Sequence, residues 1–300
     1  MLAKAQSGLV ARELEQLHPG LKVELVIVST SGDRIADRPL HEFGGKGLFT
    51  KELEQALLDA KVDFAVHSFK DVPVTMPLVE QSNLVIASVP KREDPRDLLV
   101  CHRASSLTQL PQGLRIGTGS LRRRCQILAS RPDLKVEPIR GNIDTRVRKL
   151  QAGDYDAVIL ATAGTRRGGI FDPQLMHPIE PEELLPAAGQ GALALQCRND
   201  DPRTQELLKA MNDPVTRACV TAERELVRLL NGDCHSPIAA LAQSGPDDSL
   251  TLRAAVGARG GDPPIISASS VGRISSPIEL ASQVFQQLLA QGAPALLHGK

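Results

Sequence analysis

The sequence predicts an α/β protein with two similar lobes, a central cleft and a smaller α+β domain at the C-terminus. Helix and strand patterns alternate through the first half of the chain, which is typical of a parallel sheet with crossover helices. The alternation restarts after PKREDPRD, residues 90–97, a segment whose proline and charge indicate a crossing between lobes. From about residue 213 the pattern changes to strand-like runs between two helices, and a chain of 300 residues is too long for one small core.

The first lobe begins with an amphipathic helix, MLAKAQSGLVARELEQL, and residues 22–29 follow as a predicted strand. The next helix is predicted from apolar residues at helical spacing: Phe49, Leu53, Ala56, Leu57 and Ala60. Residues 64–66 then form a short predicted strand. A lobe of this kind normally opens with a strand that feeds its first helix, so we expect one inner strand of this lobe to be missing from the sequence as given.

The second lobe is predicted to contain strands at residues 114–117, 135–139 and 157–161 and helices at residues 121–129 and 144–151. Gly153 is placed as the C-terminal stop of the second of these helices. In the C-terminal domain we expect helices at residues 215–230 and 278–289 and strands at residues 237–241, 250–256 and 265–271. The three domains are therefore expected at residues 1–89 with 192–210, at residues 95–186 and at residues 213–300.

Composition argues against several classes of protein. The 35 basic residues balance 35 acidic ones, so the basic surplus of a general nucleic-acid or membrane-surface binder is absent. Aromatic residues make up 2% of the chain, which leaves few platforms for base stacking. No apolar run approaches the ~20 residues of a membrane span, and the first helix lacks the features of a signal peptide. The 5 cysteines contain no CxxC pair, which favours a reducing cytoplasm over a disulfide framework or a zinc site.

The segment AVHSFKDVPV, residues 65–74, carries the strongest sign of a functional site. A strand-like run breaks there into a polar turn with Lys70 and Asp71, and Pro73 prevents the strand from continuing. Ligands of open α/β sheets gather outside the carboxyl ends of strands, where this turn lies. The lysine favours the charged form of the neighbouring carboxyl group. Taken alone, the segment favours an ordinary surface turn that holds a Lys–Asp pair, and the arginines and the cysteine elsewhere in the chain shift the interpretation to a functional site.

Arginines follow three predicted strands of the second lobe: Arg122, Arg123 and Arg124 the first, Arg140 and Arg146 the second, Arg166 and Arg167 the third. The first cluster lies in GTGSLRRRCQ, at the start of a helix, where its charge opposes the helix dipole unless anions compensate it. One cluster alone could be a solvated helix face, but three after successive strands indicate an anion site. Guanidinium groups bind carboxylates through two parallel hydrogen bonds, so carboxylates are the expected anions.

Two further loops carry reactive or cationic residues. Cys234 lies in NGDCHSP, just past a predicted helix, and His235 beside it is placed to favour the thiolate. The glycine-rich loop HEFGGKG carries Lys46 before a helix, without the spacing of a P-loop. His41 and His67 have no partner at ligand spacing and are interpreted as structural.

Seven segments, taken in order, resemble the porphobilinogen deaminase family of tetrapyrrole biosynthesis: GGKGLFTKELE, AVHSFKDVP, REDPRD, GTGSLRRRCQ, RGNIDTR, PAAGQGALALQCR and GDCHSP. The resemblance runs through nearly the whole chain, and the ordered set is highly specific. It implies a transferase that condenses four porphobilinogen molecules stepwise, with loss of ammonia, into the linear tetrapyrrole hydroxymethylbilane. It also implies two lobes like those of periplasmic binding proteins, a monomer, and porphobilinogen as the partner in place of nucleic acid or a membrane.

The resemblance further implies a cofactor and a set of site residues. Cys234 would carry a dipyrromethane primer through a thioether, and hydrolysis would release the product and leave the primer in place. Asp71 and Lys70 match catalytic positions, where Asp71 would contact pyrrole N–H groups and manage the proton at the coupling carbon. Other positions match residues that bind cofactor carboxylates, namely Ser68, Lys70, Thr118, Ser120, Arg122, Arg123 and Arg140, or substrate carboxylates, namely Arg146, Arg167 and Lys46.

The sequence departs from the family in two places. Family members begin with R-[IV]-[GA]-T-R-x-S-x-L-A-x-x-Q, of which only Leu2, Ala3 and Gln6 are present, and Gly119 stands where the family often has serine. Two alternatives stay open: a non-catalytic two-lobed protein that binds a small anionic ligand, and an inactive, truncated deaminase. The first would not need a reactive cysteine in a third domain.

Overall fold

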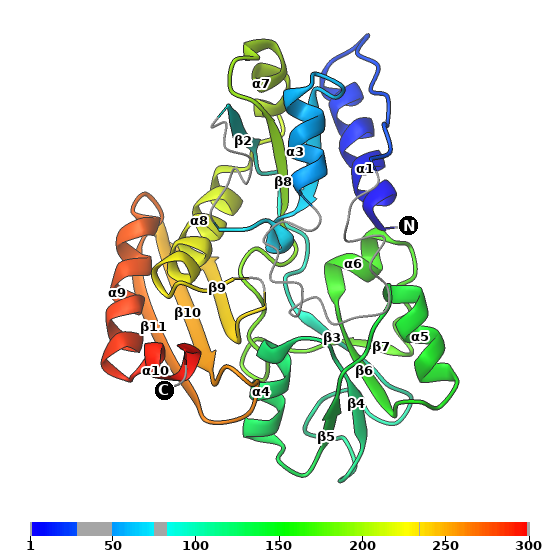
Figure 1. Cartoon of the computed structure of the whole chain (residues 1–300), viewed down its shortest axis with the longest axis vertical. Coiled ribbons are helices and arrows are strands. Elements are labelled where there is room, and N and C mark those ends of the chain that lie inside the picture. The colour runs from blue at the N-terminus through cyan, green and yellow to red at the C-terminus, as the bar shows by residue number, and fades with distance from the viewer. Residues whose placement is uncertain (1, 29–49, 75–82, 234, 299–300) are drawn as a thin grey trace. The chain divides into compact units, whose positions relative to one another are not determined.

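The computed structural model describes residues 2–28, 50–74, 83–233 and 235–298. The chain divides into two compact units (Figure 1): unit 1 comprises Met1–Glu93 and Ala192–Arg217, and unit 2 comprises Asp94–Gly191 and Ala218–Lys300. The crossing expected at residues 90–97 coincides with the boundary between the units. The second expected domain and, from residue 218 on, the third both fall in unit 2, and their division into separate domains stays a prediction.

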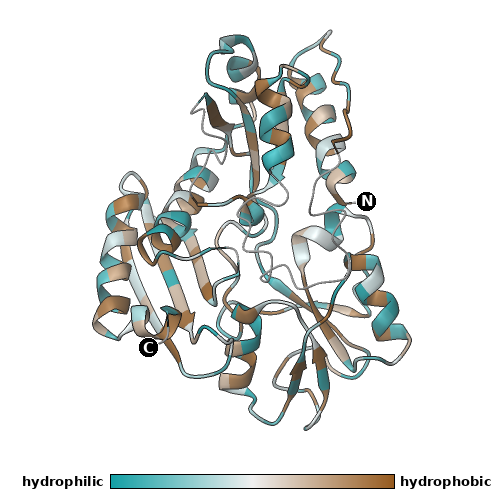
Figure 2. Cartoon of the chain, in the orientation of Figure 1, coloured by the Kyte–Doolittle hydropathy of each residue, from teal (hydrophilic) through white to brown (hydrophobic). Residues whose placement is uncertain are grey.

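Unit 1 is built on a three-stranded sheet of order β1–β8–β2, in which both pairings are antiparallel. Its elements are β1 (Phe64–Ser68), β2 (Leu84–Ser88), β8 (Leu193–Arg198), α1 (Leu2–Leu17), α3 (Lys51–Leu58), η2 (Phe69–Asp71, a 3-10 helix) and α7 (Pro202–Lys209). α1 carries both hydrophilic and hydrophobic residues (Figure 2) and buries Val10 and Leu14 in a cluster with Leu195 of β8. The two helices predicted for this part of the chain are confirmed, whereas β2, β8 and α7 were not predicted.

The strand predicted at residues 22–29 is wrong over the residues that the structure describes, because residues 21–28 run without strand pairing. A cavity of about 970 Å³ lies between this segment, α1 and β1. Within the described residues, β1 pairs on one side only, with β8. Among the described residues, no strand pairs with this segment. Leu25, Val26 and Ile27 are exposed to 48%, 56% and 71%, whereas Leu21 and Val23 pack against the apolar cluster of unit 1.

Unit 2 contains a five-stranded mixed sheet of order β5–β4–β6–β3–β7. Its elements are β3 (Asp97–Val100), β4 (Arg115–Gly117), β5 (Lys135–Glu137), β6 (Ala157–Ala161), β7 (Met176–Pro178), α4 (Leu121–Ser130), α5 (Ile143–Gln151) and α6 (Thr162–Arg167). β4 is parallel to β5 and β6, as the alternating pattern predicts, whereas β3 is antiparallel to β6 and β7. The predicted strands and helices of this lobe are confirmed; β3, β7 and α6 were not predicted.

The C-terminal part of unit 2 is an antiparallel sheet of order β11–β10–β9 with helices. Its elements are β9 (Ile238–Ser244), β10 (Ser249–Gly257), β11 (Ile265–Arg273), α8 (Pro214–Leu229), α9 (Pro277–Ala290) and α10 (Ala293–His298). α9 packs along β11 and β10 (Figure 1), so the predicted α+β arrangement is confirmed. Glu223 of α8 is fully buried and accepts hydrogen bonds from the N–H groups of Gly189 and Ala242 at 2.7 and 2.8 Å, which ties this part to the loop before β8.

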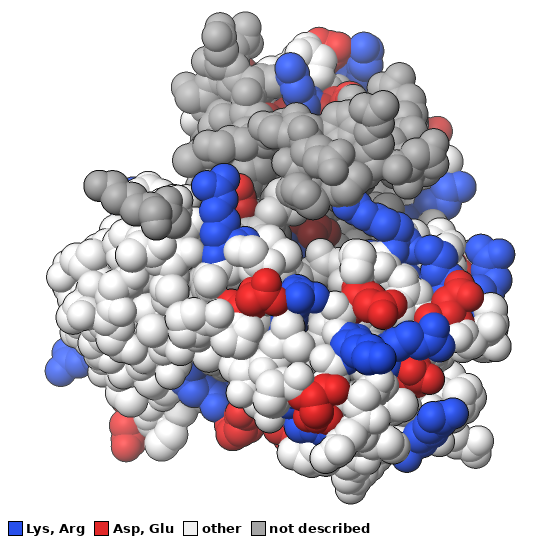
Figure 3. Space-filling model, turned by 60° about the horizontal axis from the view of Figure 1, so that its bottom comes forward, with Lys and Arg blue, Asp and Glu red and all other residues white. Residues whose placement is uncertain are grey.

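Charges of both signs are mixed on the surface. On the face shown in Figure 3, lysines and arginines are interspersed with aspartates and glutamates. Neighbouring pairs such as Arg131 with Asp133, whose Nη2 and Oδ2 atoms lie 2.7 Å apart, account for the mixture locally. On this face the two signs of charge are not segregated into separate patches. A cationic site in this protein must be a local feature.

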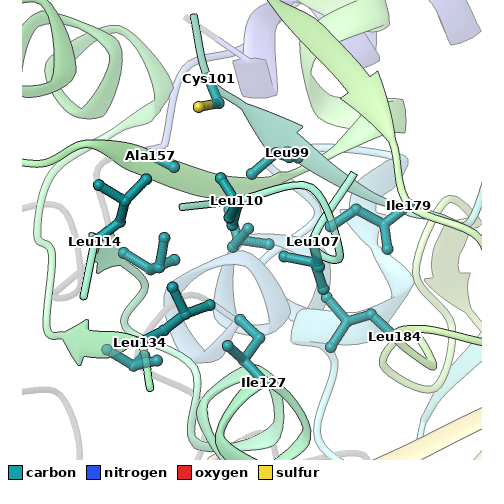
Figure 4. Packing of buried hydrophobic residues seen from close by; sticks show 13 residues of the cluster. Leu99, Cys101, Leu107, Leu110, Leu114, Ile127, Leu134, Ala157, Ile179 and Leu184 are labelled. Carbon is teal, nitrogen blue, oxygen red and sulfur yellow. The ribbon is translucent and has the colours of Figure 1, made fainter. Parts of the chain in front are cut away.

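The mixed sheet of unit 2 is buried on both faces. Ile159 of β6 lies in one apolar cluster with Leu99 and Ile127 (Figure 4), whereas the next residue, Leu160, lies in a second cluster with Leu98. Successive side chains of a strand point to opposite faces, so the continuous apolar run of β6 fills both cores. This packing fixes the strands whose ends carry the arginines.

Candidate functional site

Three parallel strands bring the arginine clusters to one edge of the mixed sheet. β5, β4 and β6 are neighbours and run in the same direction, so their carboxyl ends lie at the same edge. The arginines that follow them are Arg122 and Arg123 on α4, Arg140 before α5, Arg146 on α5 and Arg167 on α6. The structure therefore gathers at one edge residues that lie up to 45 positions apart in the sequence.

The turn between β4 and α4 contains two predicted site residues, Thr118 and Ser120. The Ser120 hydroxyl caps α4 by accepting a hydrogen bond from the N–H group of Arg123 at 3.5 Å, and Thr118 Oγ1 accepts one from the N–H group of Ser120 at 3.2 Å. A Cβ atom at Gly119 would lie 3.1 Å from the carbonyl oxygen of Ile139. Glycine thus fits the close approach of the segment that follows β5 to this turn, and a serine there would displace that carbonyl by a few tenths of an ångström.

Arg122 and Arg123 point into unit 2 and share one carboxylate, that of Asp97 at the start of β3. Arg122 Nη1 donates to Asp97 Oδ2 at 2.7 Å, and Arg123 donates to Oδ1 from Nη2 at 2.7 Å and from Nε at 3.0 Å. The sequence indicated that anions must compensate these cations at a helix start. The structure supplies one such anion from the chain itself, and Asp262 pairs with Arg124 in the same way at 2.7 Å.

Asp97 is a functional candidate that the sequence analysis missed. Burial alone would raise the pKa of its carboxyl group, but the charges and hydrogen bonds of Arg122 and Arg123 outweigh burial and hold that pKa well below its usual range. The signal in the sequence was an aspartate directly before the apolar run Leu98–Val100, because a carboxylate that begins a fully buried strand requires a cationic partner.

The surroundings of Arg146 disfavour its charged form. Its Nε donates to the carbonyl oxygen of Gly141 at 2.8 Å. Burial, followed by the charges of Arg123 and Arg140, lowers the pKa of Arg146 to about 10. A bound anion would stabilise a guanidinium in such a position. This edge of the sheet is therefore suited to anion binding.

The last predicted arginine of this edge, Arg167, is half-buried, and its Nη2 donates to the carbonyl oxygen of Gly191 at 2.8 Å. Its neighbour Arg166 lies 5.3 Å from the centre of the Phe171 ring and 3.5 Å from Asp94 Oδ2. Arg166 is therefore held by contacts within unit 2, whereas Arg167 is tied to the end of the loop before β8.

Unit 1 carries the other described site residues at the carboxyl end of β1. Ser68 ends the strand, and its hydroxyl accepts a hydrogen bond from Gln6 Nε2 of α1 at 3.1 Å. Lys70 and Asp71 follow in η2, where Lys70 is half-buried and Asp71 is exposed. The short helix is anchored by the N–H group of Phe69, which donates to the carbonyl oxygen of Ala192 at 3.0 Å. Strand β1 runs two residues further than predicted, but the turn lies where the sequence places it.

Cys234 and Lys46 lie outside the described residues, but both neighbours of Cys234 are described. Asp233 Oδ1 accepts hydrogen bonds from the N–H groups of His235 and Ser236 at 2.9 and 2.8 Å and from the Ser236 hydroxyl at 2.9 Å. Partial burial would raise the pKa of Asp233, yet these hydrogen bonds lower it below its usual value. Asp233, which the sequence analysis did not single out, thus holds the main chain of His235 and Ser236, the residues that follow the predicted cofactor-bearing cysteine in the sequence.

Family models match almost the whole chain. Residues 1–206 match the model described as "Porphobilinogen deaminase, dipyromethane cofactor binding domain", and residues 217–290 match "Porphobilinogen deaminase, C-terminal domain". A solved structure of immunogenic lipoprotein A from Vibrio vulnificus aligns at 16% identity over 73% of this chain and 95% of that chain, with a TM-score of 0.41. That similarity is too weak to carry the fold assignment, which the observed elements and the family models support.

Curated relatives match over the same length. A porphobilinogen deaminase of Brevibacillus brevis is 46% identical over 296 residues, which cover 99% of this chain and 93% of the relative. Enzymes of the same name from Roseiflexus sp. and Syntrophobacter fumaroxidans are 43% and 46% identical and are covered to 96% and 94%, again with 99% of this chain. The family models and the near-complete coverage of these relatives agree with the seven segments read from the sequence, and the chain belongs to the porphobilinogen deaminase family.

Proposed function

We propose that this protein is a hydroxymethylbilane synthase, a transferase that joins four porphobilinogen molecules stepwise, with loss of ammonia, into hydroxymethylbilane. Membership of the family supports the reaction. The single structural observation that carries the proposal is the arginine edge of unit 2, where the half-buried Arg146 lies close enough to Arg123 and Arg140 for their charges to lower its pKa. Each pyrrole of the growing chain bears an acetate and a propionate group, so the ligand is a polyanion that such an edge can hold.

The described residues fit a dipyrromethane cofactor. The carboxylate of Asp97 faces two guanidinium groups, and the half-buried Arg146 adds a further cation, so positive charge outnumbers negative charge within this group of four residues. When bound through Cys234, the cofactor supplies the pyrrole carbon to which the next unit is joined. The residues that would hold its carboxylates are Ser68, Lys70, Thr118, Ser120, Arg122, Arg123 and Arg140.

Asp71 and Lys70 have the catalytic roles in this proposal. Asp71 is exposed at the end of η2, so its carboxylate can accept hydrogen bonds from pyrrole N–H groups and take the proton from the coupling carbon. Lys70 beside it favours the ionised carboxylate. Arg146, Arg167 and Lys46 bind the carboxylates of the incoming porphobilinogen and thereby orient it for coupling.

The proposal includes a cytoplasmic monomer whose partner is porphobilinogen, without nucleic acid. The 5 cysteines of the sequence, which contain no CxxC pair, support a reducing compartment. In the part of the chain that the structure describes, no helix has the length and apolar character needed to cross a membrane.

An intact-mass measurement of the purified protein tests the proposal, with Cys234→Ala and Cys219→Ala as matched variants. We expect the wild-type chain and Cys219→Ala to carry a mass surplus equal to two linked pyrrole units, and Cys234→Ala to carry none. Cys219 is the suitable control because it is buried in α8. Unmodified mass in the wild type, together with no turnover of porphobilinogen, would contradict the proposal and favour a binding protein or an inactive deaminase.

A further inference from the structure

We infer that Asp97 is a positioning residue, which holds Arg122 and Arg123 in the orientation in which they act on the carboxylates of the pyrrole chain. The inference rests on the proposed function. Asp97 begins β3, far in sequence from both arginines, and its side chain is 0% exposed. It therefore reaches the ligand only through the guanidinium groups that it holds.

Both carboxylate oxygens of Asp97 are engaged. Arg122 binds in a forked manner, with Nη1 on Oδ2 at 2.7 Å and Nη2 on Oδ1 at 3.2 Å. Arg123 reaches Oδ1 through Nη2 and Nε, and Gln190 Nε2 donates to the same oxygen at 2.9 Å. One carboxylate thus fixes the planes of two guanidinium groups, because each is bound through two of its nitrogens.

The guanidinium groups are also held by main-chain carbonyls. Arg123 donates from Nη1 to the oxygen of Ile159 at 2.8 Å and from Nη2 to that of Leu160 at 2.9 Å, both on β6. Arg122 Nη1 donates to the carbonyl oxygen of Leu185. Contacts on more than one side prevent rotation of these side chains, so their charge stays at the carboxyl ends of β4 and β6.

The charges of this cluster do not cancel. Two guanidinium groups face one carboxylate, and the remaining positive charge is felt by Arg146, whose pKa is lowered partly by Arg123. Without Asp97, two buried cations would repel each other with no counter-ion between them. We therefore expect a neutral side chain at this position to reorient the arginines and weaken the binding of carboxylates.

The test compares Asp97→Asn with Asp156→Asn in the holoenzyme. Asp156 is the matched control because it also pairs with an arginine of this sheet, accepting from the N–H group of Arg115 at 2.8 Å, but at the amino ends of β4 and β6. For Asp97→Asn we expect fewer chains with the cofactor mass and, in the loaded fraction, a KM for porphobilinogen raised about 10-fold, with kcat changed far less. For Asp156→Asn we expect a lower thermal midpoint with an unchanged KM.

Full cofactor loading and a KM within about twofold of the wild type in Asp97→Asn would overturn the inference and leave Asp97 a structural residue. If Asp97→Asn does not fold, Asp97→Glu replaces it, since it keeps the charge and moves it by one methylene. A folded Asp97→Glu with a raised KM supports the inference, and an unchanged KM contradicts it.

Failure of the proposed function is distinguishable from failure of this inference. A wild-type chain that neither carries the cofactor nor turns over porphobilinogen would overturn the proposed function. The affinity of the wild type and of Asp97→Asn for inorganic pyrophosphate, measured by calorimetry, then tests Asp97 alone. Weaker binding by Asp97→Asn supports a positioning role, and equal binding contradicts it.

Discussion

The charge of Arg146 lowers the stability of the folded protein and, in the proposed function, binds substrate carboxylates. Burial and the neighbouring cations lower its pKa to about 10, so replacing it with a neutral side chain removes an unfavourable charge. We expect Arg146→Gln to leave the free energy of unfolding unchanged or slightly raised. The same variant loses charged hydrogen bonds to substrate, each worth roughly 1.5–3 kcal/mol, so its KM for porphobilinogen should rise about 10- to 100-fold.

The control for this prediction lies on the same helix. Arg148 of α5 is exposed, and its Nη2 donates to Thr145 Oγ1 at 3.3 Å. Steady-state kinetics and urea unfolding of Arg148→Gln should match the wild type. Equal KM values for Arg146→Gln and Arg148→Gln would show that Arg146 does not bind substrate.

His67 makes the stability of unit 1 depend on pH. Burial lowers its pKa to about 4, although the side-chain oxygen of Gln196, 2.9 Å from Nε2, partly opposes this effect. Between pH 4 and 6.5 the unfolded chain therefore binds a proton that the folded chain does not. The stability that neutral His67 provides is complete above pH 6.5 and is lost as the pH falls toward 4, by about 3 kcal/mol in total.

Urea unfolding at several pH values between 4 and 7 measures this dependence. Other groups titrate in the same range, so the informative quantity is the difference between the wild type and His67→Gln. We expect the difference in unfolding free energy to shrink as the pH falls. A difference that is constant with pH would mean that His67 has the same pKa in the folded and unfolded chains, so that burial does not lower it.

Residue-level reasoning from the sequence identified the arginines but not the aspartate that holds two of them. A local argument about the helix dipole shows that Arg122 and Arg123 need an anion. It cannot name the source, because Asp97 lies 25 and 26 positions away and reaches them only when β3 joins the sheet. The same argument does not distinguish an anion of the chain from an anion of the ligand.

At the scale of elements, local patterns were sufficient where strand and helix alternate. The strands and helices predicted from residue 114 to residue 161 are confirmed, because both predicted helices are amphipathic and each lies between two of the short strands. β8 was missed because it gains its partners from distant segments, pairing Leu193 with Ser68 and Arg198 with Leu84. The strand predicted at residues 22–29 is the opposite error. An apolar run was predicted as a strand, but residues 22–28 have no strand partner among the described residues.

The connection between β5 and α5 depends on Gly141. Its φ of +108° is costly for other residues, and a Cβ atom there would lie 2.5 Å from Thr145 Cγ2. We expect Gly141→Ala to lower the free energy of unfolding by about 1–3 kcal/mol and to weaken substrate binding, because the carbonyl oxygen of Gly141 holds Arg146.

Gly153→Ala separates the cost of a positive φ from the cost of the contact with Thr145. Gly153 also has a positive φ, +80°, but a Cβ atom there meets nothing within 4 Å. Thermal unfolding of this variant measures the backbone cost alone, and its KM should equal that of the wild type. If both variants lose the same stability, the contact with Thr145 contributes nothing.

At the scale of the whole molecule, the predicted site residues are distributed over two units. Ser68, Lys70 and Asp71 follow β1 in unit 1, and the arginines follow three strands in unit 2. The sequence predicts this distribution because each group directly follows a strand. The side chains that hold these residues in place could not be predicted, because they depend on packing within each unit. The hydrogen bond from Gln190 to Asp97 is an example.

The cavity of unit 1 leads to a prediction about the whole chain. It lies between α1, residues 21–28 and β1, whose far edge carries no strand among the described residues. The hydrogen bond from Gln6 to Ser68 places the first turns of α1 at the carboxyl end of β1. An added strand that leads into α1 would therefore run parallel to β1, pair with its open edge and fill the cavity.

We expect an extension of about seven residues before Met1, with alternating apolar side chains, to raise the thermal midpoint by roughly 5 °C or more, since pairing and burial both stabilise the folded state. The control is an extension of equal length with proline at alternate positions, which cannot donate the hydrogen bonds of a strand. Intact mass of both proteins then shows whether the strand also promotes cofactor loading, because β1 leads directly to Lys70 and Asp71. Equal midpoints for the two extended proteins would mean that the cavity does not accept a strand.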